Sequence, residues 1–153
     1  MLNLLSASLE EVQNRAPGQR VVVSPHHVLA AAQAEHTVVV AGYPTGRHHS
    51  LVKAAEARLA VQSGAAEVWV AVDALLADST ALLSELVTLR EACPLPVKLG
   101  LILPVRSVGS VEDLAHAAEQ AGYQCLVVLN DGDEENPAAE SAAGLSQLPV
   151  VRL

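Results

Sequence analysis

The segment from residue 37 to residue 73 constrains the fold of this chain more than any other part. It reads TVVVAGYPTGRHHSLVKAAEARLAVQSGAAEVWVAVD. Residues 37–42 and 67–72 are apolar runs rich in β-branched side chains, which is typical of strands buried on both faces. Residues 51–63 predict a helix between them, ended by Gly64, where a helix favours a left-handed residue. This succession predicts a right-handed βαβ crossover with parallel strands.

The predicted helix at residues 51–63 has two kinds of surface. Its charges are carried by Lys53, Glu56 and Arg58. We expect Lys53 on the solvent-exposed face, in a surface ion pair with Glu56 three residues later. The face expected to point inward consists of Val52, Ala55, Leu59 and Gln62.

The rest of the chain predicts the same alternation of strands and helices. Further strands are expected at residues 20–24, 97–103, 125–129 and 149–153, and residues 1–6 fit either a strand or a packing arm. Helices are expected after the caps Ser8, Ser79 and Ser110, at residues 28–34, and after Asn136-Pro137.

Two architectures fit this single α/β domain of 153 residues. One is an incomplete (β/α) barrel of six or seven parallel strands. The other is an open, doubly wound parallel sheet. A closed (β/α)₈ barrel typically needs ~250 residues. An incomplete barrel would leave sheet edges open, so we expect a second copy of the chain to cover them in a homo-oligomer.

Three motifs of the segment, in their order and spacing, resemble the signature of the deoxyribose-phosphate aldolases, a class I aldolase family. These are GYPTG at residues 42–46, KAAE at 53–56 and GAAEV at 64–68. The resemblance implies (β/α)₈ ancestry and favours the incomplete, TIM-barrel-related architecture. We expect the eighth βα unit, and with it the family's phosphate-binding loops, to be missing from this chain.

The resemblance also assigns the family's catalytic positions to residues of the wrong type. The position of the family aspartate carries Trp69, that of the Schiff-base lysine Val127, and that of the second lysine Arg152. An arginine side chain does not deprotonate in proteins and therefore forms no imine. We expect Trp69 to face the barrel interior with Ala71, while Val68 and Val70 face the helices.

Polar residues follow several predicted strands and are expected at the carboxyl-end face of the sheet, where parallel α/β folds bind ligands. Histidine with arginine suits a phosphate or a carboxylate, whereas adjacent histidines are a poor metal pattern. We predict neither a metal nor a cofactor, and solvated loop residues remain an alternative. The candidates are His26, His27, Thr45, Arg47, His48, His49, Asp73, Arg106, Asn130 and Asp131.

Three functions stay open at this point. The chain could be a degenerate aldolase relative that still binds a small phosphorylated or carbonyl metabolite, an active aldolase or lyase with other catalytic residues, or a non-catalytic assembly or regulatory protein. The net charge of −8 argues against nucleic-acid and anionic-membrane partners. The lack of a long apolar run or a charged leader predicts a cytoplasmic protein with reduced Cys93 and Cys125.

Overall fold

The computed structural model describes residues 1–105, 110–129 and 144–153. In this part of the chain, seven strands form one parallel sheet whose spatial order is the order of the sequence. The strands are β1 (Leu2–Asn3), β2 (Arg20–Val23), β3 (His36–Ala41), β4 (Glu67–Ala71), β5 (Lys98–Ile102), β6 (Cys125–Val128) and β7 (Val150–Arg152). Every strand expected from the sequence is present, including the one left open at the start of the chain.

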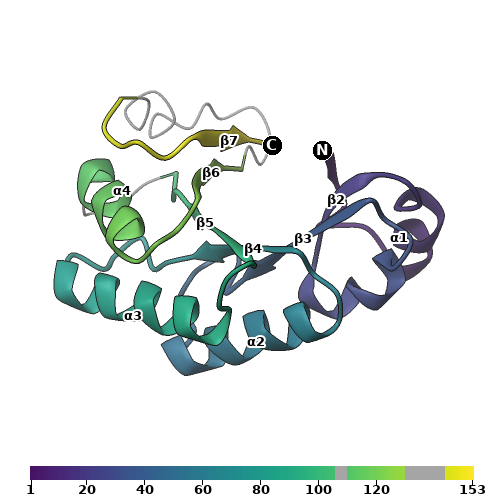
Figure 1. Cartoon of the computed structure of the whole chain (residues 1–153), viewed down its shortest axis with the longest axis horizontal. Helices are drawn as coiled ribbons and strands as arrows, with labels where there is room; N and C mark the ends of the chain where they lie inside the picture. Colours follow the sequence, from purple (N-terminus) through teal and green to yellow (C-terminus); the bar gives the residue numbers. More distant parts are fainter. Residues whose placement is uncertain (106–109, 130–143) are drawn as a thin grey trace.

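The sheet curls into an arc, and the helices lie along its outer side (Figure 1). They are α1 (Leu9–Arg15), α2 (Ser50–Gln62), α3 (Ser79–Ala92) and α4 (Val111–Gln120). A sequential strand order with helices on one side is the arrangement of a half-barrel. The doubly wound alternative is wrong, because it places helices on both faces of the sheet.

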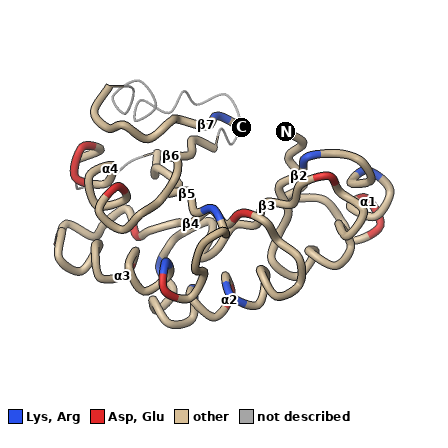
Figure 2. Tube along the Cα trace, viewed as in Figure 1, with Lys and Arg blue, Asp and Glu red and all other residues tan. Residues whose placement is uncertain are grey.

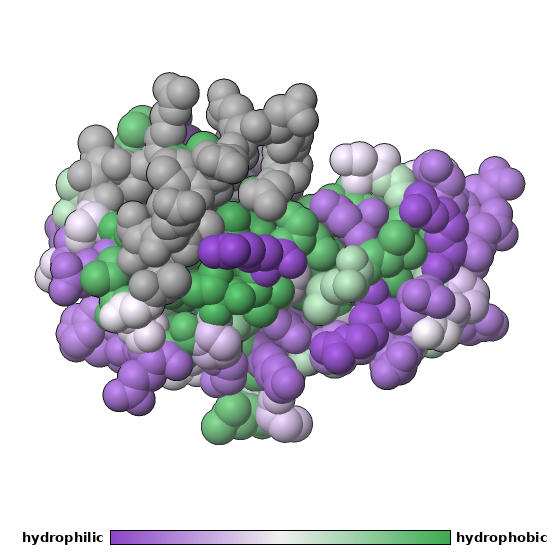
Figure 3. Space-filling model, turned by 90° about the horizontal axis from the view of Figure 1, so that it is seen from above, coloured by the Kyte–Doolittle hydropathy of each residue, from purple (hydrophilic) through white to green (hydrophobic). Residues whose placement is uncertain are grey.

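Side chains alternate across the sheet and form two apolar layers. Val68 and Val70 pack toward the helices, and Trp69 and Ala71 toward the concave interior, as predicted. Hydrophobic residues occupy the centre of the concave side when it is seen from above (Figure 3). Charged residues lie mainly in the helices and turns around the sheet (Figure 2). The half-barrel is therefore filled by side chains on both faces of its sheet.

The expected orientation of α2 is wrong. Its buried residues are Lys53, Ala54, Ala57 and Ala60. Val52 and Leu59, expected to face inward, are 56% and 63% exposed. A stripe of alanines lets the helix approach the sheet closely, and Lys53 is buried because its charge finds partners there, as described below.

Of the three helix caps that the sequence predicts, two are confirmed and one lies a residue earlier than expected. The capping box of Ser8 and Glu11 and the cap at Ser110 are confirmed. The cap of α3 is Asp78 instead of Ser79, because the Asp78 carboxylate accepts from two backbone N–H groups of the first turn.

The expected helix at residues 28–34 is wrong. It is replaced by the short 3₁₀ helices Pro25–His27 and Leu29–Ala31. A segment this short is a marginal α-helix. The expected helix after Asn136 lies outside the described residues.

Both ends of the sheet are open in the described part of the chain, because β1 and β7 each pair on one side only. The homo-oligomer expected from such edges stays a prediction, for which the molar mass from light scattering is the test. None of the helices seen in residues 1–105, 110–129 and 144–153 is long and apolar enough to cross a membrane.

Candidate functional site

The loop between β3 and α2 contains two glycines that no other residue could replace without strain. Gly42 and Gly46 have positive φ angles of 71° and 68°. A Cβ atom on Gly46 would lie 2.1 Å from the carbonyl carbon of Val72 and 2.6 Å from the backbone nitrogen of Asp73. The loop therefore rests directly on the chain that leaves β4, and this contact requires a glycine at position 46. Gly42 is required for a different reason, because a Cβ atom there would lie 2.3 Å from the Lys53 side chain.

Lys53 connects this loop to the rest of the sheet. Its side chain is fully buried. The ammonium donates to the carbonyl oxygens of Gly46 at 2.7 Å and Ala71 at 3.1 Å, and it forms an ion pair with the Glu85 carboxylate of α3. Three donors thus meet three acceptors, which makes the burial of a lysine charge tolerable. The surface ion pair expected between Lys53 and Glu56 is wrong.

Glu56 has a different partner from the one expected. Its carboxylate accepts a hydrogen bond of 2.7 Å from the backbone N–H of Gly42. The KAAE motif therefore fixes both ends of the GYPTG loop, with Glu56 at its beginning and Lys53 at its end. In this chain, the two motifs act together to shape the carboxyl-end rim of the sheet.

Three of the candidate residues meet at this rim. The Nε of Arg47 lies 3.4 Å from the Asp73 carboxylate, and the two side chains are 61% and 30% exposed. The Thr45 hydroxyl accepts a hydrogen bond of 3.3 Å from the backbone N–H of Arg47. The Arg47 guanidinium is thus accessible to solvent, and Asp73, which follows β4, contacts it through its Nε.

The four candidate histidines have local surroundings of their own. His49 Nδ1 accepts from the backbone N–H of Leu51 and caps α2, and His48 is exposed. The rings of His26 and His27 lie 3.8 Å apart between centroids. Burial lowers the pKa of His27, and the proximity of His26 lowers it further. The buried Nδ1 of His27 has no hydrogen-bond partner among the described residues.

The remaining rim candidates, Arg106, Asn130 and Asp131, lie outside the described residues. Arg152, the expected counterpart of a family lysine, is exposed on the edge strand β7.

The interior position to which the resemblance assigns the family aspartate is filled by the fully buried indole of Trp69. The Nε1 of Trp69 donates a hydrogen bond of 2.7 Å to the Glu67 carboxylate. A Cβ atom on Gly100 would lie 2.7 Å from the Trp69 ring and 2.9 Å from Val127. The indole therefore occupies this place because position 100 of the neighbouring strand has no side chain.

Glu67 organises the amino-end part of the interior. Its second carboxylate oxygen lies 3.1 Å from the His36 Nε2 of β3. Its first oxygen also accepts from the Cys125 thiol at 3.8 Å. Burial, followed by the nearby Glu67 charge, raises the pKa of Cys125 to about 12, so this cysteine stays a thiol at neutral pH.

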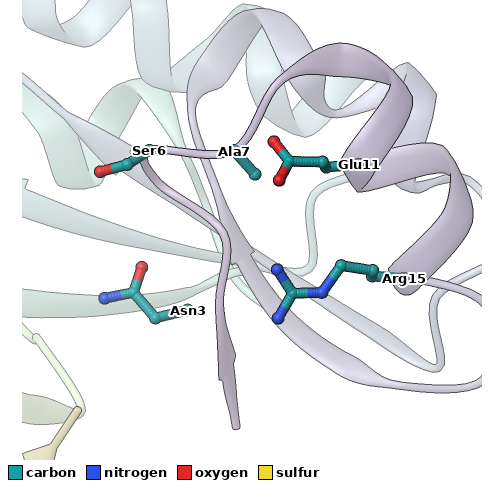
Figure 4. Close-up of a pocket in the computed structure, with 5 residues that line it drawn as sticks. All are labelled: Asn3, Ser6, Ala7, Glu11 and Arg15. Carbon is teal, nitrogen blue, oxygen red and sulfur yellow. The ribbon is translucent and has the colours of Figure 1, made fainter.

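A pocket of about 370 Å³ lies away from the rim, beside the edge strand β1. Its lining residues are Asn3, Ser6, Ala7, Glu11 and Arg15. The side chains of Glu11 and Arg15 reach from α1 toward the loop after β1 (Figure 4). None of the candidate site residues lines this pocket.

Comparison with known proteins agrees with the resemblance in the sequence motifs. The chain is 40% identical over 107 residues to a deoxyribose-phosphate aldolase of Nocardia farcinica, covering 67% of this chain and 48% of that protein. It is 48% identical over 84 residues to one of Corynebacterium jeikeium, covering 53% of this chain and 34% of the relative. The chain is a divergent relative of the deoxyribose-phosphate aldolases.

Solved aldolases share the fold of this relative. The tetrameric deoxyribose-phosphate aldolase of Aeropyrum pernix superposes with a TM-score of 0.69 at 19% identity, covering 98% of this chain and 82% of that structure. No protein-family model matches the chain. The chain spans about half the length of the Nocardia relative and about a third of the length of the Corynebacterium jeikeium relative.

Sequence reasoning missed three residues that shape this deoxyribose-phosphate aldolase relative. Lys53 was placed on the surface, and neither Glu85 nor Glu67 was a candidate. The missing information is tertiary, because Glu85 lies 32 residues from Lys53 in the chain and becomes its partner only when α2 and α3 pack together.

Proposed function

We propose that this deoxyribose-phosphate aldolase relative forms no Schiff base and binds a small phosphorylated or carbonyl metabolite at the carboxyl-end rim around Arg47. The observation that carries the proposal is the placement of the lysines. The chain has two, Lys53 and Lys98. Lys53 is fully buried with all three of its donors engaged, and Lys98 is exposed at the amino end of β5.

The surroundings of both amines oppose imine formation. A Schiff-base lysine must be partly neutral and must reach the carbonyl carbon of its substrate. Lys53 is fully buried, and its ammonium is engaged by the Glu85 carboxylate and two backbone carbonyls, so a substrate carbonyl does not reach it. In parallel (β/α) folds, ligands bind at the carboxyl ends of the strands, and Lys98 begins its strand at the opposite end.

The rim retains the chemistry needed to hold an anion. Arg47 is largely exposed, and its contact with Asp73 engages the Nε edge of the guanidinium. The opposite edge of a guanidinium can pair with two oxygens of a phosphate or carboxylate. Asp73 orients the arginine, and the Thr45 hydroxyl lies two residues before it in the same loop.

The trapping experiment tests the first half of the proposal. The protein is incubated with deoxyribose 5-phosphate or acetaldehyde in the presence of borohydride, and the intact mass is measured. No added mass is expected, because Lys53 is fully buried and Lys98 lies at the end of the sheet opposite the rim. A stable adduct that maps to Lys53 or Lys98 would contradict the proposal and favour an active aldolase.

The same protein preparation tests the rim by titration with inorganic phosphate and deoxyribose 5-phosphate, followed by calorimetry. Arg47→Met should abolish the binding, because it removes the exposed guanidinium. Arg58→Met, which removes an exposed arginine from the outer side of α2, should leave the binding unchanged. Equal effects of the two substitutions would mean that only general charge matters and that the rim is not the site.

A further inference from the structure

We propose that Lys53 is a positioning residue that holds the two backbone segments carrying Arg47 and Asp73 against each other. Glu85 stabilises the buried ammonium of Lys53, and Glu56 holds the other end of the loop that carries Arg47. The inference rests on the proposed function of the rim and names the device that preorganises it. Lys53 touches neither the rim side chains nor, in this proposal, the ligand.

The position of the ammonium is the first argument. One of its acceptors is the carbonyl of Gly46, whose peptide bond leads into Arg47. Another is the carbonyl of Ala71, two residues before Asp73. A single charged group thus fixes the backbone on both sides of the rim ion pair. Because the two segments follow different strands, no local hydrogen bond could hold them in this way.

The supports of Lys53 are the second argument. Glu85 supplies the opposite charge from α3, and an isolated buried charge would be strongly unfavourable without it. Glu56, one turn after Lys53 on α2, holds the N–H of Gly42 at the beginning of the same loop. Lys53 and Glu56 of α2 therefore hold the two ends of the loop between β3 and α2 by hydrogen bonds.

The close approach of Gly46 is the third argument. Its Cα lies so near the backbone of Val72 and Asp73 that a methyl group would collide with both. The Lys53 bond to the Gly46 carbonyl keeps this contact closed. If the contact opens, Arg47 loses its fixed place beside Asp73, and a ligand must then order the loop as it binds.

The test compares two variants of the full chain. The double substitution Lys53→Met and Glu85→Gln removes the bridge without leaving an unpaired buried charge. Arg90→Met is the matched control, because Arg90 also binds backbone carbonyls, those of Cys93, Val97 and Gly122, but at the amino end of the strands. Both variants are expected to lower stability to urea, and the readouts are phosphate affinity and the Arg47 Nε–Hε resonance.

We expect the double variant to bind inorganic phosphate about tenfold more weakly. This loss corresponds to a loop that adopts the phosphate-binding conformation about a tenth of the time. The Arg47 Nε–Hε resonance should move toward that of a freely rotating arginine. Arg90→Met should change neither readout. Unchanged phosphate affinity and an unchanged Arg47 resonance in a folded double variant would overturn the proposal.

A second variant keeps the test decisive if the double variant does not fold. Glu56→Met releases only the Gly42 end of the loop and should shift the Arg47 resonance in the same direction, whereas Glu56→Gln keeps an acceptor oxygen and should restore it. Absence of phosphate binding by the unsubstituted protein would refute the proposed rim function. The Arg47 resonance, which needs no ligand, still decides whether Lys53 positions the rim.

Discussion

Replacing Trp69 by alanine is expected to lower the free energy of unfolding by ~3–5 kcal/mol, as truncation of a large buried aromatic side chain does. The indole is fully buried between β3 and β5, and its N–H is bonded to Glu67. Its removal leaves a cavity and takes one hydrogen bond from the buried Glu67 carboxylate. Urea unfolding followed by circular dichroism measures the loss.

The fluorescence of the parent protein provides an independent check, since Trp69 is the single tryptophan of the chain. We expect a blue-shifted emission that iodide quenches poorly. A red-shifted, readily quenched emission would contradict burial and would make the indole part of an open pocket. Gly100→Ala should also destabilise the parent. It should cost less in the Trp69→Ala background, because one of its close contacts is then gone.

Replacing Gly46 by alanine is expected to cost about 2–5 kcal/mol of stability, as the sum of a left-handed backbone penalty and an overpacked contact. The residue has a φ of 68°, and its added methyl would meet the backbone of Val72 and Asp73, which cannot move aside as a side chain could. The loss should appear in urea unfolding together with a displaced Arg47 resonance.

Gly18→Ala separates the two contributions. Gly18 also has a φ of 68°, but a Cβ there would meet nothing within 4 Å. Its substitution should therefore cost only the backbone penalty of about 1–2 kcal/mol. Equal losses at the two positions would mean that the close approach of the loop to β4 contributes nothing.

The candidate site was predictable in part. The carboxyl-end location of Arg47 and Asp73 followed from the parallel βαβ pattern, and the structure brings the two side chains together. The burial of Lys53 was not predictable, because a lysine on a helix is more often exposed than buried. Its burial depends on Glu85, and no local pattern connects residues that are brought together only by helix packing.

The sequence by itself determined the succession of the strands, because apolar β-branched runs separated by capped helical segments leave few other local structures. Alternation along the strand also predicted that Trp69 and Ala71 share one face of the sheet, and the resemblance to the aldolases predicted that this face is the interior. The tertiary structure alone decided the order of the strands, the inward face of α2 and the partner of Lys53. The physical reason is the same in each case. A half-barrel and a doubly wound sheet share one local pattern, and only contacts between distant segments separate them.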